Sequence, residues 1–258
     1  MTIVTGHLLN IFSFIFGAVV GSFLNVCIYR LPAEQSIVFP ASHCPACGHP
    51  IRYYDNIPLV SYLILKGRCR HCRGAISPVY PLVELLTALM SLLLFLRYGP
   101  SMEYLFTFIF TAALIVITFI DLEHQIIPDV ISLPGIPLFA LAAILFTDLS
   151  LRDSLIGIIA GGGVLYVVAA GYQFLKKTEG MGGGDIKLLA MMGGFLGWQS
   201  LLFVILFSSL IGAVVGIALI IYKKGDMKYA IPFGPFLSIA AVAYLFWGDL
   251  FMQFIIYR

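Results

Sequence analysis

The sequence predicts an all-α, polytopic membrane protein with about eight transmembrane helices. Of its 258 residues, 60% are hydrophobic and only 11% are charged, whereas soluble proteins carry roughly 25% charged residues. The mean hydropathy is correspondingly high, at +1.01. The apolar residues also form long uncharged runs, of which 8–29 and 154–175 contain 22 residues each. Such runs are long enough to span a bilayer core, which takes roughly 20 helical residues.

The first run is predicted to be a retained helix rather than a cleaved signal peptide. Residues 1–7 contain no lysine or arginine, and the first basic residue, Arg30, follows the apolar run. A signal peptide has the opposite order, with its positive segment in front. We therefore expect the first helix to remain in the membrane with its N-terminus outside the cytoplasm.

Eight spans are expected along the chain. They are residues 8–29, 79–97, 103–121, 130–147, 153–175, 185–197, 199–222 and 232–254. The uncharged run 188–222 would be about 52 Å long as one helix, so it must break, and Gly197-Trp198-Gln199 is the expected place. The sixth span is short, and the sequence leaves open whether it crosses the bilayer or is re-entrant.

The distribution of basic residues predicts the orientation of these spans. If residues 30–78, 122–129, 176–187 and 223–231 face the cytoplasm, three basic residues remain outside, namely Arg97, Arg152 and Arg258. The other twelve are inside: Arg30, Arg52, Lys66, Arg68, Arg70, Arg73, Lys176, Lys177, Lys187, Lys223, Lys224 and Lys228. This split satisfies the positive-inside rule, with both termini outside. The net charge of +2 gives no indication of a nucleic-acid partner.

The chain is expected to divide into a first transmembrane helix (1–30), a cytoplasmic loop (31–77) and a transmembrane core (78–258). The loop has fewer than fifty residues, too few for a substantial hydrophobic core. It contains two CxxC pairs, Cys44/Cys47 and Cys69/Cys72, separated by 21 residues. This spacing is typical of a structural zinc site, and a metal would supply folding energy that the loop lacks.

Two disulfides or redox-active thiols are the alternative interpretation of the cysteine pairs. Disulfides rarely persist in the cytoplasm, so the inferred side favours zinc. His43, His49 and His71 lie beside the cysteines and are possible substitute ligands. The fifth cysteine, Cys27, lies inside the first span and is expected to be a packing residue.

Two aspartates are expected to meet at the cytoplasmic ends of spans. Asp121 follows the apolar run 112–120, and Asp185 follows Gly182-Gly183-Gly184, although the two are 64 residues apart. Ionisable residues at membrane depth are costly and are functional candidates. A pair of nearby carboxylates can share one proton, so that one acts as a general base and the other as a general acid. The glycines would let the backbone approach a substrate strand; a flexible loop with Asp185 as an N-cap is the alternative.

Two other acids stand out less clearly. Glu84 lies inside the second span, where the sequence allows a buried partner, a substrate contact or a snorkelling side chain. Asp129 follows Pro128 and is expected to cap the fourth span.

Taken together, these motifs resemble one known family, the bifunctional type IV prepilin peptidases (prepilin leader peptidase/N-methyltransferases). The likeness covers nearly the whole chain and lies in the order and character of several motifs. They are Gly21–Pro32, the paired cysteines with Asn56-Ile57-Pro58 and Gly67-Arg68-Cys69, Ile76–Glu84, Asp121 with Ile127-Pro128-Asp129, and Gly182-Gly183-Gly184-Asp185. Each motif is weak alone, but the set is specific. Preflagellin peptidases share the aspartate pair and generally lack the cysteine loop.

The resemblance implies a GxGD-type aspartic peptidase with Asp121 and Asp185 as its catalytic residues. Gly182 and Gly184 match the motif glycines, and Gly183, Lys187 and Glu84 are expected to position the motif or the substrate. Cys44, Cys47, Cys69 and Cys72 match the tetracysteine motif of the family. The implied substrates are prepilins or pseudopilins, cut at the cytoplasmic face of a bacterial inner membrane.

The resemblance also implies that the new amino terminus is methylated with S-adenosylmethionine (SAM) as the methyl donor. No soluble dinucleotide-type glycine fingerprint is present, so the sequence does not locate the SAM site. Two other functions stay open. A transporter or channel would use Asp121 and Asp185 for ion coupling but leaves the cysteine loop unexplained. A methyltransferase with inactive carboxylates would keep SAM-dependent labelling after Asp185→Asn.

Overall fold

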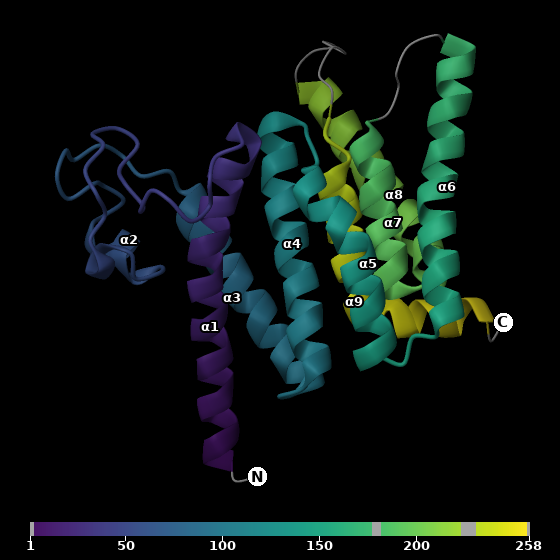
Figure 1. The fold of residues 1–258 in the computed structure, drawn as a ribbon, viewed down its shortest axis with the longest axis horizontal. Helices are drawn as coiled ribbons and strands as arrows, with labels where there is room; N and C mark the ends of the chain where they lie inside the picture. Colours follow the sequence, from purple (N-terminus) through teal and green to yellow (C-terminus); the bar gives the residue numbers. More distant parts are fainter. Residues whose placement is uncertain (1–2, 177–181, 223–230, 257–258) are drawn as a thin grey trace. The chain divides into compact units, whose positions relative to one another are not determined.

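The computed structural model describes residues 3–176, 182–222 and 231–256 (Figure 1). These residues form helices and no β-strand, so the all-α prediction is confirmed for this part of the chain. The predicted cytoplasmic segments 176–187 and 223–231 include residues 177–181 and 223–230, which lie outside this range. Lys177, Gly180, Met181, Lys223, Lys224, Lys228 and Arg258 therefore lie outside the described residues.

Seven of the described helices are long and apolar enough to cross a membrane, which makes the chain a multi-pass membrane protein. They are α1 (Ile3–Arg30), α3 (Val79–Tyr98), α4 (Met102–His124), α5 (Asp129–Phe146), α6 (Leu151–Lys176), α8 (Gln199–Tyr222) and α9 (Gly234–Ile256). Each predicted span corresponds to one helix, and the ends differ by a few residues. The largest difference at a predicted site is at α4, which continues past Asp121 to His124.

The eighth apolar segment forms α7 (Gly183–Leu196), which has only 14 residues. A helix of that length is about 21 Å long, shorter than the bilayer core. α7 ends at Gly197, whose φ of 81° lies in the left-handed region that glycine adopts without strain. The predicted break at this position is confirmed, since α8 begins at Gln199.

The chain forms two compact units, Met1–Val116 and Ile117–Arg258. The three-part division expected from the sequence stays a prediction. In the first unit, α1 packs along α3 through Gly17 and Gly21. A Cβ added at Gly17 would lie 2.5 Å from the Ser91 side chain, and one at Gly21 would lie 2.7 Å from Cα of Glu84. Two small residues four positions apart let membrane helices approach closely.

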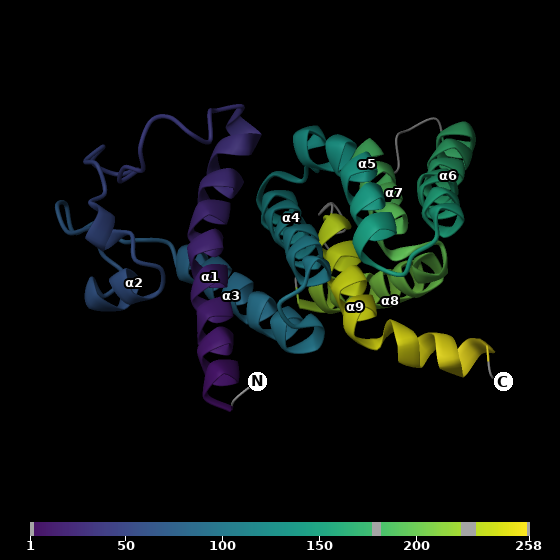
Figure 2. The same cartoon turned by 60° about the horizontal axis from the view of Figure 1, so that its bottom comes forward.

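The second unit is built around α7, which packs against α5 and α6 (Figures 1 and 2). α6 and α7 approach each other at Gly157 and Gly193, where a Cβ on either residue would lie about 2 Å from the carbonyl oxygen of the other. Ser154 adds a 2.7 Å hydrogen bond to the carbonyl of Gly194. Residues 188–195 of α7 are all buried, so this helix is enclosed by protein rather than lipid.

The outer helices carry large apolar side chains on their exposed faces. On α8 these include Leu202, Leu206, Leu210, Val214 and Ile217, which recur every three or four residues. Such a stripe forms one face of a helix. Since the other face of α8 packs against α9, the exposed stripe is suited to contact lipid.

Candidate functional site

Asp121 lies in the last two turns of α4 and is buried, with 5% of its surface exposed. Its Oδ2 accepts a hydrogen bond of 3.0 Å from the backbone N–H of Gly234. Gly234 is the first residue of α9, and the first N–H groups of a helix have no partner inside the helix. The carboxyl group of Asp121 therefore satisfies one of these free donors and is held in place by it.

Asp185 lies in the first turn of α7, three residues after the N-cap Gly182. It is not the N-cap itself, so that alternative interpretation is wrong. Its backbone N–H instead bonds to the carbonyl of Gly182 at 3.2 Å. The charge of Asp121 acts on the Asp185 carboxyl through space. The structure thus brings together, within the second unit, the two aspartates that the sequence singled out.

Ile127 is the side chain that lies between the segments carrying the two aspartates. It belongs to the short connection between α4 and α5. A Cβ at Gly184 would lie 2.8 Å from the Ile127 Cβ, and a Cβ at Gly234 would lie 3.3 Å from its Cδ1. Gly184 precedes Asp185, and Gly234 bonds to Asp121. One isoleucine therefore packs against the backbone next to both carboxyl groups.

Lys187 and Asp129 form an ion pair, with the Lys187 Nζ 2.7 Å from Oδ1 of Asp129. Asp129 is the first residue of α5; the N-cap is Pro128, which makes no side-chain capping bond. The expectation that Asp129 caps this helix is therefore wrong, because its carboxylate turns to Lys187 instead. The pair joins the start of α5 to the start of α7. Since both side chains are partly exposed, it contributes about 0–1 kcal/mol.

Glu84 is buried in α3, in the first unit, and bonds to the cysteine-containing loop. Its Oε2 accepts the backbone N–H of Leu59 at 2.8 Å, and its carboxylate also bonds to the Ser22 side chain. Nearby, the Asn25 amide donates to the carbonyl of Tyr80 at 3.0 Å. Of the three possibilities for Glu84, the structure therefore supports a buried partner that ties the loop to α1 and α3.

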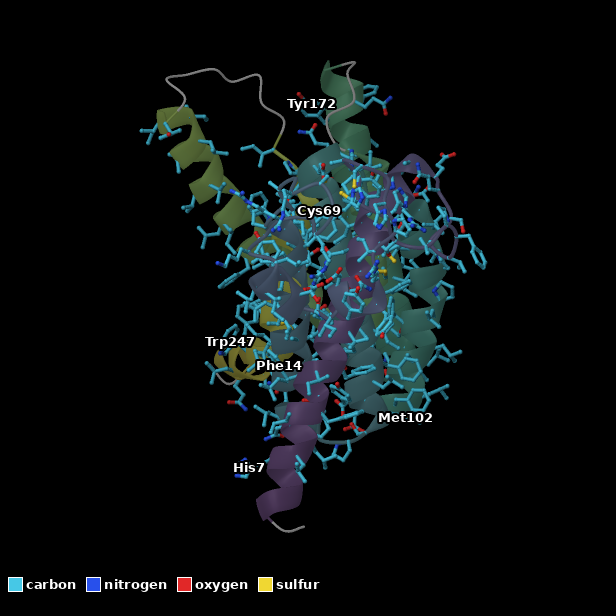
Figure 3. All side chains as sticks on the ribbon, turned by 90° about the vertical axis from the view of Figure 1, so that its left-hand side faces the viewer. His7, Phe14, Cys69, Met102, Tyr172 and Trp247 are labelled. Carbon is cyan, nitrogen blue, oxygen red and sulfur yellow. The ribbon has the colours of Figure 1, made fainter. Side chains whose placement is uncertain are left out.

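Cys44, Cys47, Cys69 and Cys72 come together, and their sulfur atoms all lie within 4.8 Å of one another (Cys69 is labelled in Figure 3). The Sγ atoms of Cys44 and Cys72 are 3.9 Å apart. A tetrahedral zinc site with Zn–S bonds near 2.3 Å places its sulfurs about 3.8 Å apart. The donor set and spacing therefore fit a zinc ion. No disulfide joins these thiols, and Cys27 is separate and buried, as expected.

The two cysteine pairs sit on equivalent turns of the loop. In the first, the N–H of Cys44 bonds to the carbonyl of His49 at 2.9 Å; in the second, Cys69 bonds to Gly74 at 2.8 Å. The residue that follows each cysteine pair has a left-handed backbone conformation. In the first turn this residue is Gly48, with a φ of 68°. In the second turn this position is Arg73, with φ of 61°, and not the glycine that follows it.

The predicted alternative histidine ligands do not join the four thiols. The rings of His49 and His71 stack on each other, with centroids 4.3 Å apart. The Nδ1 of His43 faces the carbonyl of Ala41 at 3.2 Å. All three histidines are therefore placed beside the sulfur cluster rather than in it.

The thiols differ in how readily they ionise. Backbone N–H groups of Cys72 and His71 point at the Cys69 sulfur and lower its pKa to about 7. At Cys47 the N–H of His49 favours the thiolate, but desolvation and the sulfurs of Cys44 and Cys72 outweigh it and raise the pKa to about 11. Four sulfurs this close cannot all carry charge without a cation. The cluster is therefore suited to a metal ion that replaces the thiol protons.

An ion pair between Arg70 and Asp55 holds the second cysteine turn against the rest of the loop. Arg70 bonds to both carboxylate oxygens of Asp55, at 2.6 to 3.0 Å. The Arg70 side chain lowers the pKa of Asp55. The guanidinium also lies over the Tyr54 ring, 5.6 Å from its centroid. These contacts orient a loop that otherwise contains only short helical turns and the five-residue α2 (Val60–Ile64).

Gly234 and Ile127 are the two site residues that sequence reasoning did not identify. Ile127 was noted only as part of a motif, and Gly234 not at all. The sequence does carry a signal for Gly234, because it lies between Phe233 and Pro235 at the start of an apolar run. That pattern marks a helix start. It cannot show which carboxylate the start faces.

The fold and the site define a multi-pass helical membrane protein with a four-cysteine cluster in its first unit and two neighbouring carboxylates in its second. Two family models match the chain: the N-terminal domain of bacterial A24 peptidases over residues 15–98, and the type IV leader peptidase family over residues 108–217. The chain belongs to the type IV leader peptidase family and is an enzyme.

Curated relatives support this assignment along almost the full length. A protein named prepilin leader peptidase/N-methyltransferase from Aeromonas hydrophila is 43% identical, with 92% of this chain and 90% of the relative aligned. Proteins of the same name from Aeromonas salmonicida (strain A449) and Pseudomonas aeruginosa (strain PAO1) are 42% and 41% identical, over 92% and 90% of this chain and 90% and 88% of the relatives. No solved structure matches the chain.

Proposed function

We propose that this enzyme removes the leader peptide of type IV prepilins or pseudopilins and then methylates the new amino terminus. Relatives aligned over nine-tenths of the chain carry a name that combines these two activities. The observation that supports the peptidase activity is that Asp121 and Asp185 lie near each other within one unit. Asp121 belongs to α4 and Asp185 to α7. Their proximity therefore results from the packing of the fold and not from closeness in the sequence.

The proposed cleavage is aspartic-peptidase chemistry with a shared proton. One carboxylate takes a proton from a water molecule, whose oxygen attacks the scissile carbonyl carbon. The other carboxyl group gives its proton to the leaving amine as the C–N bond breaks. Together the pair acts as one unit of base and acid. The Gly234 N–H fixes the Asp121 carboxyl group, and we assign the two motif glycines, Gly182 and Gly184, to the approach of the substrate strand.

Methylation would use SAM, which supplies an electrophilic methyl group to the exposed amine. The four cysteines would hold a structural zinc ion, since their sulfurs fit a closed tetrahedral site with no position left for substrate. We assign this site to the shape of the loop rather than to the chemistry.

We place the two aspartates at the cytoplasmic face of a bacterial inner membrane. The end of α4, the starts of α5 and α7 and the end of α6 lie at one end of the second unit (Figure 1). The sequence assigns twelve of fifteen basic residues to this side of the membrane. A prepilin leader is short and basic, so its junction with the apolar helix would meet the aspartates at this interface.

The decisive experiment compares cleavage of a prepilin-like substrate by the purified enzyme in detergent with cleavage by Asp121→Asn and Asp185→Asn. Each variant is expected to lose the leader-sized fragment while keeping the wild-type thermal stability. Asp148→Asn is the matched control, because Asp148 is an exposed acid between α5 and α6. This variant should cleave the substrate as the wild type does. Cleavage at the wild-type rate by either site variant would remove that residue from the proposed pair.

Methylation is measured in the same reactions as transfer of radiolabel from SAM to a substrate that was cleaved beforehand. Asp185→Asn should still methylate this substrate if the two activities use separate sites. Label transfer with no cleavage by the wild type would identify a methyltransferase alone. Ion flux through wild-type vesicles without either reaction would favour the transporter alternative.

A further inference from the structure

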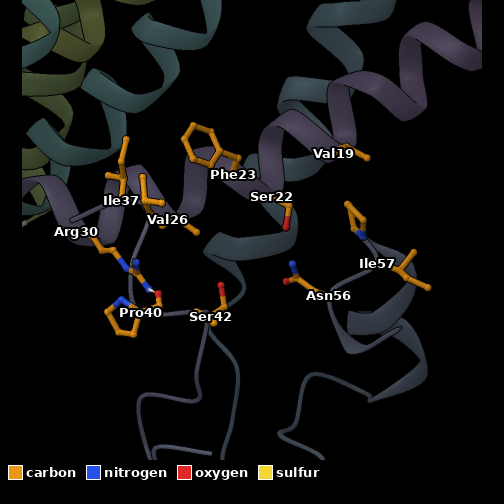
Figure 4. A pocket seen from close by; sticks show the side chains of 13 residues that line it. Val19, Ser22, Phe23, Val26, Arg30, Ile37, Pro40, Ser42, Asn56 and Ile57 are labelled. Carbon is orange, nitrogen blue, oxygen red and sulfur yellow. Dashed lines mark hydrogen bonds between the residues drawn. The ribbon is translucent and has the colours of Figure 1, made fainter. Parts of the chain in front are cut away.

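A pocket of about 520 Å³ lies within the first unit, between the C-terminal half of α1 and the loop that follows it (Figure 4). Its walls come from α1, from residues 37–42 and from residues 56–58. Sites for small molecules typically occupy about 300–1,000 Å³. Neither Asp121 nor Asp185 is among the residues that line it.

The lining of the pocket combines an apolar wall with a few polar groups. Val19 and Phe23 project from α1, while Ser22, Ser42 and Asn56 bring hydroxyl and amide groups to the same space. Small-molecule sites usually have this composition, in which the apolar part gives affinity and the polar groups fix orientation.

Arg30 brings a buried positive charge to the pocket. Its side chain is only 6% exposed and donates to the carbonyls of Ser36 at 2.9 Å and Pro40 at 2.7 Å. Within the part of the chain that the structure describes, no carboxylate pairs with this guanidinium. Carbonyl dipoles and the C-terminal end of α1 stabilise the charge without neutralising it. A guanidinium has five donors, so some remain for an anionic ligand.

An acidic group stands behind the other end of the pocket. Ser22, in the wall, bonds to the carboxylate of Glu84. Ser22 and Arg30 are eight residues apart on α1, which is about 12 Å along the helix axis. The pocket therefore has a guanidinium at its Arg30 end and is backed by an acidic side chain at its Ser22 end.

We propose that this pocket binds SAM, an inference that rests on the methyltransferase activity proposed above. SAM carries a carboxylate, a positive sulfonium group and an adenosine whose adenine ring is flat. The carboxylate is assigned to Arg30, the sulfonium-bearing part is directed toward the end that Glu84 backs, and the adenosine lies on the wall of Val19 and Phe23. A phospholipid phosphate would also suit Arg30, but the phosphate has no positive group to place near the acidic side chain behind Ser22.

The test is binding of radiolabelled SAM to the full-length protein in detergent, measured by equilibrium dialysis. Val38→Trp fills the pocket from a side chain that is 68% exposed and should weaken binding at least tenfold. Val60→Trp is the matched control, an exposed valine in the same loop that does not line the pocket, and should bind as the wild type does. Arg30→Gln should also weaken binding at least tenfold. Zinc content checks that the loop of each variant remains folded.

The possible outcomes separate this inference from the proposed function. If the wild type binds SAM and Val38→Trp binds it equally well with its zinc retained, the pocket assignment is overturned and the proposed function stands. If the wild type cleaves prepilin but binds no SAM, the proposed methyltransferase activity fails and the assignment fails with it. If Val38→Trp weakens binding of short-chain phosphatidylglycerol and not of SAM, the pocket is a lipid site and the proposal is wrong.

Discussion

Gly234 and Asp121 are 113 residues apart in the chain, yet the N–H of Gly234 donates to the Asp121 carboxyl over 3.0 Å. The contact is direct because Gly234 has no side chain. A Cβ at this position would lie 2.6 Å from Oδ2 and 3.3 Å from Cγ of Asp121. The start of α9 therefore holds one of the two proposed catalytic groups and leaves no space for a larger residue.

Gly234→Ala is expected to lower the rate of prepilin cleavage by about 100-fold. The new methyl group displaces the Asp121 carboxyl, and a misplacement near 1 Å costs about that factor. Gly216→Ala is the control, because a Cβ there meets only Ile231 at 3.6 Å, an ordinary contact. The measurement is the cleavage rate at saturating substrate, with thermal stability followed in parallel. Equal rates in the two variants would contradict the assigned role of Gly234.

Adjacent glycines in the Gly182-Gly183-Gly184 motif are expected to respond differently to alanine. Gly184→Ala places a Cβ 2.8 Å from the Cβ of Ile127, and we expect cleavage to fall at least tenfold because Asp185 is the next residue. At Gly183 a Cβ meets nothing within 4 Å, so Gly183→Ala should stay within about twofold of the wild type. Cleavage rates measured side by side check this. A large loss in Gly183→Ala alone would assign that glycine to the substrate rather than to packing.

Gly193→Ala is expected to destabilise the second unit. Its Cβ would lie 2.2 Å from the carbonyl oxygen of Gly157, so α6 and α7 must separate. Overpacking of a tight interior typically costs 1–3 kcal/mol, and we expect roughly 3 kcal/mol here because the opposing atom is backbone. Gly163→Ala on α6 is the control, with nothing within 4 Å of its Cβ. Thermal unfolding in detergent should show a lower midpoint for Gly193→Ala only.

The cysteine loop is expected to bind one zinc ion per chain, measured by elemental analysis of the purified protein. Cys47→Ser should lower the zinc content, whereas Cys27→Ser should not, since Cys27 is buried in α1 away from the cluster. Removal of zinc with a chelator should expose residues 31–77 to proteases, because the loop has little packing of its own. The helical circular dichroism signal should hardly change. A full zinc content in Cys47→Ser would contradict the four-thiolate site.

The sequence was sufficient to predict the seven long helices of the described residues, because their apolar runs have the length of a membrane span. The break at Gly197 and the grouping of the four cysteines could be predicted for similar local reasons. The sequence also singled out Asp121 and Asp185. Placing a carboxylate at membrane depth costs free energy, so such residues are functional candidates. These predictions depend on composition and spacing within one segment.

Predictions that depended on contacts between distant segments were less successful. Asp129 is not a helix cap because Lys187, 58 residues further on, binds its carboxylate. The importance of Ile127 follows from its contact with Gly184 and Gly234, which no local pattern contains. Glu84 could not be assigned from the sequence because its partner is a backbone N–H in a loop. Such contacts are specified only when helices pack.

The contact between Asp121 and the start of α9 also has a consequence for the order in which activity appears during synthesis. A chain is made from its N-terminus, so Asp121 and Asp185 are both translated before the segment that holds Asp121 in position. α7 is too short to settle in lipid alone and must be enclosed by its neighbours. A ribosome-bound chain that ends before residue 234 therefore holds both aspartates but lacks the N–H that positions Asp121. We expect the proposed peptidase to reach full activity only after α9 has been inserted.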